Sequence, residues 1–257
     1  MILTPLCAAF VIPAPAAQWL HYGFEWAALL TGLATYRWRR TQAGAPGLLT
    51  AGTFAPLLGA LLGAAIGNKL VAWFDAGGCE QGFRCGLALL LGGQSIVGGL
   101  LGGWIGVEAG KRVAGIAVRT GDDYVLPVLV ALAVGRVGCF LAGLPDGTCG
   151  NPTSVCWGVD FGDGIPRHPT QLYEIAVATL AAATWPFWRR GFSSRPGLSF
   201  RVMMFGYLAW RLFIDFLKPV PYAYAFNLSG IQWVCIVGLV AIAVGLARAR
   251  GRDHESS

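Results

Sequence analysis

Two arginines lie inside apolar stretches of the chain, where a charge is costly. Arg136 lies in the run Val134-Gly-Arg-Val-Gly-Cys-Phe140, and Arg211 follows Trp210 in a second apolar run. A charged side chain at the centre of a bilayer costs at least about 2.5–3.5 kcal/mol, so such a residue indicates a function. The guanidinium is a rigid fork that matches phosphate, and in a membrane the abundant phosphate belongs to phospholipid headgroups.

The surroundings of the two arginines differ in sequence. Tyr207, Arg211 and Asp215 follow one another at intervals of four residues, which places them on one face of a helix. Arg211 and Asp215 could therefore neutralise each other inside a bundle, with no further role. Arg136 has no acidic neighbour in sequence, so we expect its anion to be Asp215, Glu174 or a ligand.

A polar run at residues 167–174 supplies groups that could move a proton. It reads Arg-His-Pro-Thr-Gln-Leu-Tyr-Glu, and its proline suits the first turn of a helix. The side chains of His168, Gln171 and Glu174 then gather at the entrance of that helix, facing Arg136. His168 and Glu174 are candidates for a general base.

The composition predicts a membrane protein. Apolar residues make up 55% of the 257 positions and charged residues 12%, against about a quarter charged in soluble domains. The mean hydropathy is +0.58, and the 37 glycines suit helices that approach closely in lipid. The net charge of +6 lies at the ends of apolar runs, which argues against nucleic-acid binding. We predict a single all-α transmembrane domain over 1–257.

Apolar runs of about 20 residues are long enough to cross a bilayer. We predict about seven transmembrane helices, at roughly 20–36, 48–74, 86–107, 124–144, 169–187, 202–217 and 229–247. Arginines and lysines gather after the first, third, fifth and seventh runs, which predicts an outside N-terminus and a cytoplasmic tail at 248–257. Residues 145–168 then form a small periplasmic loop or cap, and the residues before the first span lie at the interface.

Cysteines and glycines raise two further questions. Cys79, Cys85, Cys149 and Cys156 fall in predicted outside loops, where they are either local pairs (79 with 85, 149 with 156) or free thiols. The glycine-rich run 92–103 lacks the lysine of a phosphate-binding loop. We interpret it as a close-packed helix or as a broken helix that lines a cavity.

These motifs together resemble one family, the bacterial phosphatidylglycerol–prolipoprotein diacylglyceryl transferases. The resemblance extends over most of the chain and is most specific in the run Arg167–Glu174. The matching residues, in family order, are Tyr22-Gly23, Ser95–Gly99, Gly135–Phe140 with Gly143 and Gly150, Arg167–Glu174, Tyr207, Arg211, Asp215 and Gln232.

The resemblance implies a multi-pass enzyme of the bacterial inner membrane that needs no cofactor or metal. Its partners would be phosphatidylglycerol, the lipid bilayer and the lipobox peptide of a preprolipoprotein, whose cysteine thiol receives the diacylglyceryl group. Arg136 and Arg211 would hold the phosphate, and Tyr207 and Asp215 would orient Arg211. The implied catalytic residues are His168, Glu174, Tyr207, Arg211 and Asp215, and the implied substrate-binding residues are Arg136, Gly135, Gly98, Gly99, Gln171 and Tyr173.

The chain departs from the family pattern at four positions. Val97 stands where the family has a histidine, and Cys139 stands where it has an asparagine. Leu144 replaces a glutamate, and Asp215 is the shorter acid. Two alternatives therefore stand beside the transferase: a related enzyme that uses a phospholipid with another acceptor, and a non-catalytic phospholipid-binding relative.

Overall fold

The computed structural model describes most of the chain and divides it into two compact units. The described residues are 12–45, 47–48, 50–78, 86–88, 90, 92–192 and 195–255. Unit 1 consists of residues 1–45, 120–200 and 216–219, and unit 2 of residues 46–119, 201–215 and 220–257. Cys79 and Cys85, and the predicted interfacial segment up to residue 11, lie outside the described residues.

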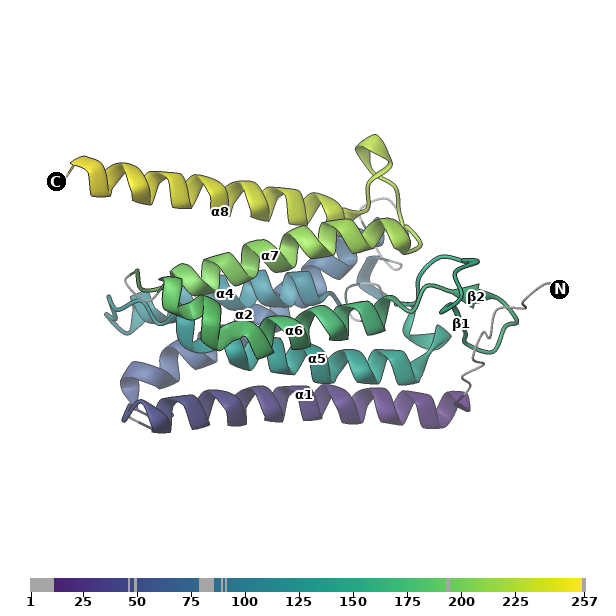
Figure 1. Ribbon diagram of the computed structural model, residues 1–257, viewed down its shortest axis with the longest axis horizontal. Helices are drawn as coiled ribbons and strands as arrows, with labels where there is room; N and C mark the ends of the chain where they lie inside the picture. Colours follow the sequence, from purple (N-terminus) through teal and green to yellow (C-terminus); the bar gives the residue numbers. More distant parts are fainter. Residues whose placement is uncertain are drawn as a thin grey trace. The chain divides into compact units, whose positions relative to one another are not determined.

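Unit 1 is built on three long helices. They are α1 (Ala14–Gln42), α5 (Val125–Ala142) and α6 (Thr170–Phe192), with the 3-10 turns η1 (Gly121–Tyr124) and η2 (Leu144–Asp146) at the two ends of α5. Helix α5 packs against both α1 and α6, as Figure 1 shows. Gly138 makes the contact with α1 close, because a Cβ there would lie 2.5 Å from the Cβ of Phe24.

A small polar cap follows α5 in unit 1. Strands β1 (Val159–Asp160) and β2 (Pro166–Arg167) form an antiparallel pair, and a bridge joins Pro152 to Arg167. Asp163, between the strands, pairs with the Arg167 guanidinium at 2.6 Å, and this hydrogen bond holds the pKa of the carboxyl below its usual range. The predicted loop or cap at 145–168 is therefore a short hairpin with turns, and it contains no long helix.

Unit 2 is built on α2 (Ala51–Asp75), α4 (Ile96–Val113) and α8 (Gly230–Glu255). Helix α7 (Leu198–Ile214) begins in unit 1, runs through unit 2, and continues into the 3-10 turn η3 (Asp215–Leu217), while η4 (Ala225–Asn227) precedes α8. Glycines of α2 and α4 face one another at intervals of four residues, and a Cβ on any of them would overlap the opposite backbone. They are Gly59, Gly63 and Gly67 of α2 and Gly98, Gly102 and Gly106 of α4. The close-packed interpretation of the glycine-rich run is confirmed for α4.

Replacing Gly63 by alanine should destabilise this helix pair by about 1–3 kcal/mol, the usual range for overpacking a tight contact. The new methyl group would meet the carbonyl of Gly102, which is backbone and cannot turn away. Thermal unfolding in detergent measures the effect. Gly245→Ala in α8 is the matched control, since a Cβ there meets nothing within 4 Å. Equal melting temperatures for the two variants would contradict the close contact.

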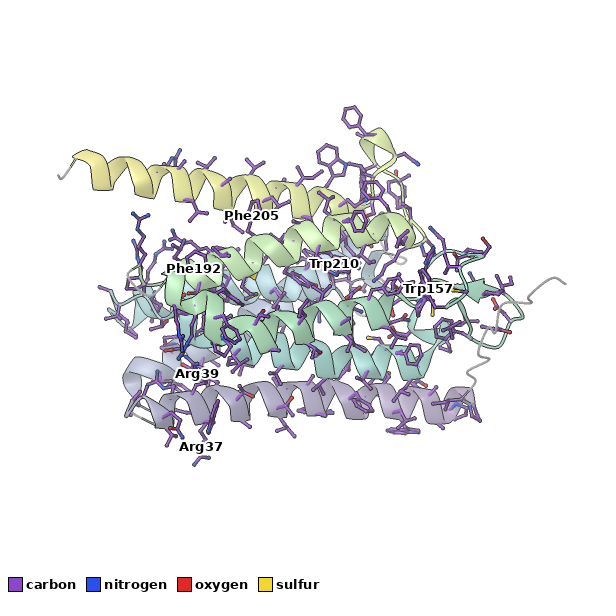
Figure 2. The ribbon with its side chains drawn as sticks, viewed as in Figure 1. Arg37, Arg39, Trp157, Phe192, Phe205 and Trp210 are labelled. Atoms are coloured by element: carbon purple, nitrogen blue, oxygen red, sulfur yellow. The ribbon has the colours of Figure 1, made fainter. Side chains whose placement is uncertain are left out.

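Three helices among the described residues are long and apolar enough to cross a membrane: Gly52–Asp75, Gly121–Ala142 and Gly230–Arg248. These helices confirm the predicted class of the chain, an all-α membrane protein. Basic residues end several helices, with Arg39 and Arg40 in the last turn of α1 and Arg189 and Arg190 in that of α6. Figure 2 shows Arg39 and Phe192 at one end of unit 1 and Trp157 at the opposite end.

Candidate active site

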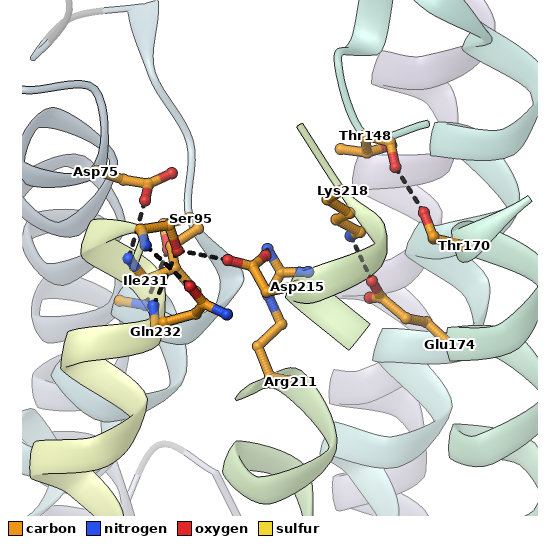
Figure 3. Close-up of polar contacts among 12 residues, drawn as sticks. Asp75, Ser95, Thr148, Thr170, Glu174, Arg211, Asp215, Lys218, Ile231 and Gln232 are labelled. Atoms are coloured by element: carbon orange, nitrogen blue, oxygen red, sulfur yellow. Dashed lines mark hydrogen bonds and ion pairs between the residues drawn. The ribbon is translucent and has the colours of Figure 1, made fainter. Parts of the chain in front are cut away.

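A buried carboxylate in unit 1 joins two buried cations. Glu174, in the second turn of α6, forms ion pairs with the Nε of Arg136 on α5 and with the Nζ of Lys218, the latter at 2.6 Å. All three side chains are less than a tenth exposed, and Figure 3 shows Lys218 reaching Glu174. We call these three residues the Glu174 cluster. Of the anions expected for Arg136, the structure supplies Glu174.

Backbone hydrogen bonds bring Lys218 to this place. The amide of Gly150 donates to the carbonyl of His168, and that of Asn151 donates to Leu217, next to Lys218. Gly150 must lack a side chain, because a Cβ there would lie 2.6 Å from the Cβ of His168 and 2.9 Å from the Leu217 carbonyl. Three segments far apart in sequence thereby close around Glu174.

The charges of the Glu174 cluster do not balance among its members. Two cations share one carboxylate, and each carboxylate oxygen takes one ion-pair partner. Two neighbouring cations in a buried place favour the binding of an anion with several oxygens, such as a phosphodiester. Lys218 was not among the residues predicted for the site, because it follows the predicted span at 202–217 and so falls in a predicted outside loop. The only available signal was a lysine three residues after Asp215.

The polar run before α6 lies beside the Glu174 cluster as an entrance. His168 Nδ1 is 3.3 Å from the hydroxyl of Tyr173, which also accepts a hydrogen bond of 2.6 Å from Trp157. The side chain of Thr170 donates to the carbonyl of Thr148 at 2.8 Å, as Figure 3 also shows. His168 is therefore tied to its own helix entrance, and the structure gives it no direct contact with Arg136.

Gln171 is fully buried at the base of this entrance. Its side-chain amide donates to the hydroxyl of Thr148 at 3.2 Å and to the sulfur of Cys149 at 3.3 Å, while its oxygen has no hydrogen-bond partner among the described residues. Burial raises the pKa of the Cys149 thiol, and the hydrogen bond from Gln171 opposes this shift. Cys149 and Cys156 are both free thiols, so the structure favours the free form over the local disulfide at this pair.

A second buried network lies in unit 2 and contains the other predicted arginine. Arg211 pairs with Asp215 at 2.9 Å, and the other oxygen of Asp215 accepts a hydrogen bond of 2.5 Å from the hydroxyl of Ser229. Gln232 and Ser229 bond reciprocally, with each backbone amide donating to the other side chain. We call Arg211, Asp215, Ser229 and Gln232 the Asp215 cluster. The internal pair that the spacing allowed is therefore formed.

Polar side chains near the Asp215 cluster fix the first turns of α8 and α4. Asp75, at the end of α2, accepts from the Ile231 amide at 2.9 Å and so caps α8, as Figure 3 shows. Ser95 caps α4 by accepting from Gly98, and the Ser95 amide donates to Asn68. The Asp215 cluster thus lies at the end of α7, beside the capped first turns of α8 and α4.

The remaining predicted residues take structural positions. Val97 is buried in the first turn of α4, and Gly98 contacts Gly67 through the backbone, whereas Gly99 has more room. A Cβ at Gly135 would make only an ordinary contact with Ala28 of α1, and the hydroxyl oxygen of Tyr207 is buried. Substrate binding by these glycines and orientation of Arg211 by Tyr207 stay predictions.

These features define a helical membrane protein with two buried clusters of charged and polar side chains, one of which contains two cations and one carboxylate. The chain belongs to the prolipoprotein diacylglyceryl transferase family, whose model matches residues 17–248. It is 32% identical over 202 residues to the phosphatidylglycerol–prolipoprotein diacylglyceryl transferase of Nitrosomonas europaea, covering 76% of this chain and 69% of that protein. The proteins of the same name from Bordetella parapertussis and Rhizobium meliloti are 30% and 32% identical, covering 73% and 77% of this chain and 72% of each relative. The resemblance read from the motifs is confirmed.

Proposed function

We propose that this chain transfers the diacylglyceryl group of phosphatidylglycerol to the cysteine thiol of a preprolipoprotein lipobox. The observation that carries the proposal is the Glu174 cluster, in which two cations share one carboxylate. The phosphodiester of phosphatidylglycerol carries one negative charge, which offsets the excess positive charge of the cluster. Membership of the family supplies the reaction.

The transfer is a displacement at the carbon that joins the diacylglyceryl group to phosphate. The thiolate sulfur attacks this carbon, the carbon–oxygen bond breaks, and glycerol phosphate leaves with the electron pair. The leaving group gains a second negative charge on phosphate as the bond breaks. Arg136 and Lys218 stabilise this developing charge, because fixed cations in a site without water are most effective where charge appears during the reaction.

The thiol must lose its proton before it attacks, since the thiolate is the nucleophile. Both oxygens of Glu174 are already engaged by cations. We therefore assign Glu174 to positioning Arg136 and Lys218, and His168 to taking the proton. Its neighbour Tyr173 holds the imidazole at the helix entrance. Phosphate contact by Arg211, with Tyr207 and Asp215 orienting it, stays part of the proposal from the family resemblance.

We infer a single transmembrane domain of about seven spans in the bacterial inner membrane, with the N-terminus and the cap outside and the tail in the cytoplasm. The basic residues that end α1, α6 and α4 support this orientation. The rule behind the inference is that arginine and lysine collect in cytoplasmic loops. Cysteine accessibility to a membrane-impermeant maleimide tests it at Cys156, which is exposed in the cap.

Complementation tests the function. We expect the chain to support growth of a bacterium depleted of its own prolipoprotein transferase, and the His168→Ala variant to do so poorly. Growth with His168→Ala but not with Arg136→Lys would move the proton transfer to another group. Failure of the parent chain, despite correct membrane insertion, would favour an enzyme with another acceptor. Phospholipid binding without any transfer would favour the non-catalytic relative.

A further inference from the structure

Three side chains with metal-ligand atoms converge at one end of unit 1. His21 comes from α1, Cys139 from the last turn of α5 and Asp146 from η2, and their ligand atoms all lie within 4.8 Å of one another. Gly143 makes the convergence possible, because its positive φ of 66° lets the chain turn from α5 into η2. The side chains of His21 and Asp146 are 17% and 8% exposed.

The geometry at His21 suggests a cation between it and Asp146. The Nδ1 of His21 lies 3.2 Å from Oδ1 of Asp146 but forms no hydrogen bond with it or with any other described atom. The other ring nitrogen, Nε2, lies 3.2 Å from Oε1 of Glu25, one turn further along α1. A histidine that binds a metal usually donates its second N–H to a carboxylate, and the Glu25 carboxylate lies within reach of Nε2 for this role. In the tautomer with its proton on Nε2, the Nδ1 atom carries a lone pair that faces the oxygens of Asp146.

We propose that His21, Cys139 and Asp146 bind a zinc ion, with water as the fourth ligand. Thiolate, imidazole and carboxylate are the three ligand types that zinc takes, with bonds of about 2.0–2.3 Å that give a tetrahedron with edges of about 3.3–3.8 Å. The present separations of up to 4.8 Å therefore need the side chains to close by at most about 1.5 Å. Binding releases the thiol proton of Cys139 to solvent.

The zinc site shares residues with the environment of Arg136. The Nη1 of Arg136 donates to the sulfur of Cys139 at 3.7 Å, and Thr148 bonds to the second oxygen of Asp146. A zinc-bound thiolate would accept the Arg136 hydrogen bond more strongly than a thiol, because hydrogen bonds to charged acceptors are about twice as strong. Zinc binding would then limit the movement of the Arg136 guanidinium, which pairs with Glu174.

Cobalt spectroscopy on the full chain in detergent tests the site. We expect one Co²⁺ per chain with a thiolate-to-cobalt absorption band, displaced by Zn²⁺, and a higher melting temperature when Zn²⁺ is present. Cys139→Ser should lose the band, His21→Ala and Asp146→Asn should weaken cobalt binding at least tenfold, and Cys149→Ser should behave as the parent does.

Two results would overturn the proposal. One is a parent chain that gives no thiolate band and no zinc-dependent shift of the melting temperature, as expected if His21 only bridges the carboxylates of Glu25 and Asp146. The other is a band that persists in Cys139→Ser or disappears in Cys149→Ser. If Cys139→Ser does not fold, the stoichiometry and affinity of cobalt binding by the His21→Ala variant decide the question instead. None of these readouts depends on transferase activity.

Discussion

Replacing Arg136 by lysine should lower the rate of diacylglyceryl transfer by roughly 10²- to 10³-fold, the range found when one donor to a developing negative charge is removed. The guanidinium pairs through Nε with Glu174 and donates through Nη1 to Cys139. An ammonium is a point charge and cannot keep this arrangement while also facing a phosphate. The rate of appearance of lipid-modified peptide in phosphatidylglycerol vesicles measures the loss.

Arg37→Lys is the matched control for this variant. Arg37 is an exposed arginine on α1, at the end of unit 1 away from the cap, as Figure 2 shows. We expect its activity to equal that of the parent chain. An Arg136→Lys variant that folds and keeps the parental rate would show that Arg136 has only a structural role.

Replacing Glu174 by glutamine should destabilise the protein by about 3–5 kcal/mol, the usual cost of removing one partner from a buried ion pair. The change keeps the shape of the side chain but leaves Arg136 and Lys218 buried without the carboxylate they share. The melting temperature in detergent measures the loss. Because both cations lose the same partner, this should be among the largest stability effects of any single polar substitution.

Two further variants make the stability prediction specific. Glu108→Gln removes the carboxylate of another lysine pair, with Lys111, but Glu108 is 47% exposed. Its partner Lys111 is buried, but solvent reaches the Glu108 carboxylate and screens the pair, so we expect a smaller destabilisation than for Glu174→Gln. The double variant Glu174→Gln/Lys218→Gln should be more stable than Glu174→Gln alone, because only one buried cation then lacks the carboxylate. Equal stability of Glu174→Gln and the parent would contradict the cluster.

Local spacing allowed the sequence analysis to predict part of this structure. The interval of four residues between Arg211 and Asp215 predicts their pairing, and the structure contains that ion pair. The glycine-rich run predicted a close helix contact, and Gly98 and Gly102 make one with α2. Both predictions depend only on the helical repeat, which local sequence fixes.

Contacts between distant segments were harder to predict. Lys218 reaches Glu174 across 44 positions because Gly150 closes the backbone between them, and no periodicity encodes such a closure. Glu174 was expected near Arg136 but as a general base, whereas its two ion pairs favour a positioning role. The convergence of His21 with Asp146 depends on the turn at Gly143 and has no sequence motif of its own.

Mass spectrometry of a lipobox peptide, incubated with the purified chain in phosphatidylglycerol vesicles, tests the central claim most directly. We predict a peptide whose cysteine carries diacylglyceryl in a thioether, together with glycerol phosphate in equal amount. The same peptide with serine in place of cysteine should stay unmodified, and so should the cysteine peptide in vesicles that contain only phosphatidylcholine. An unmodified cysteine peptide, with a folded chain and phosphatidylglycerol present, would contradict the proposed transferase.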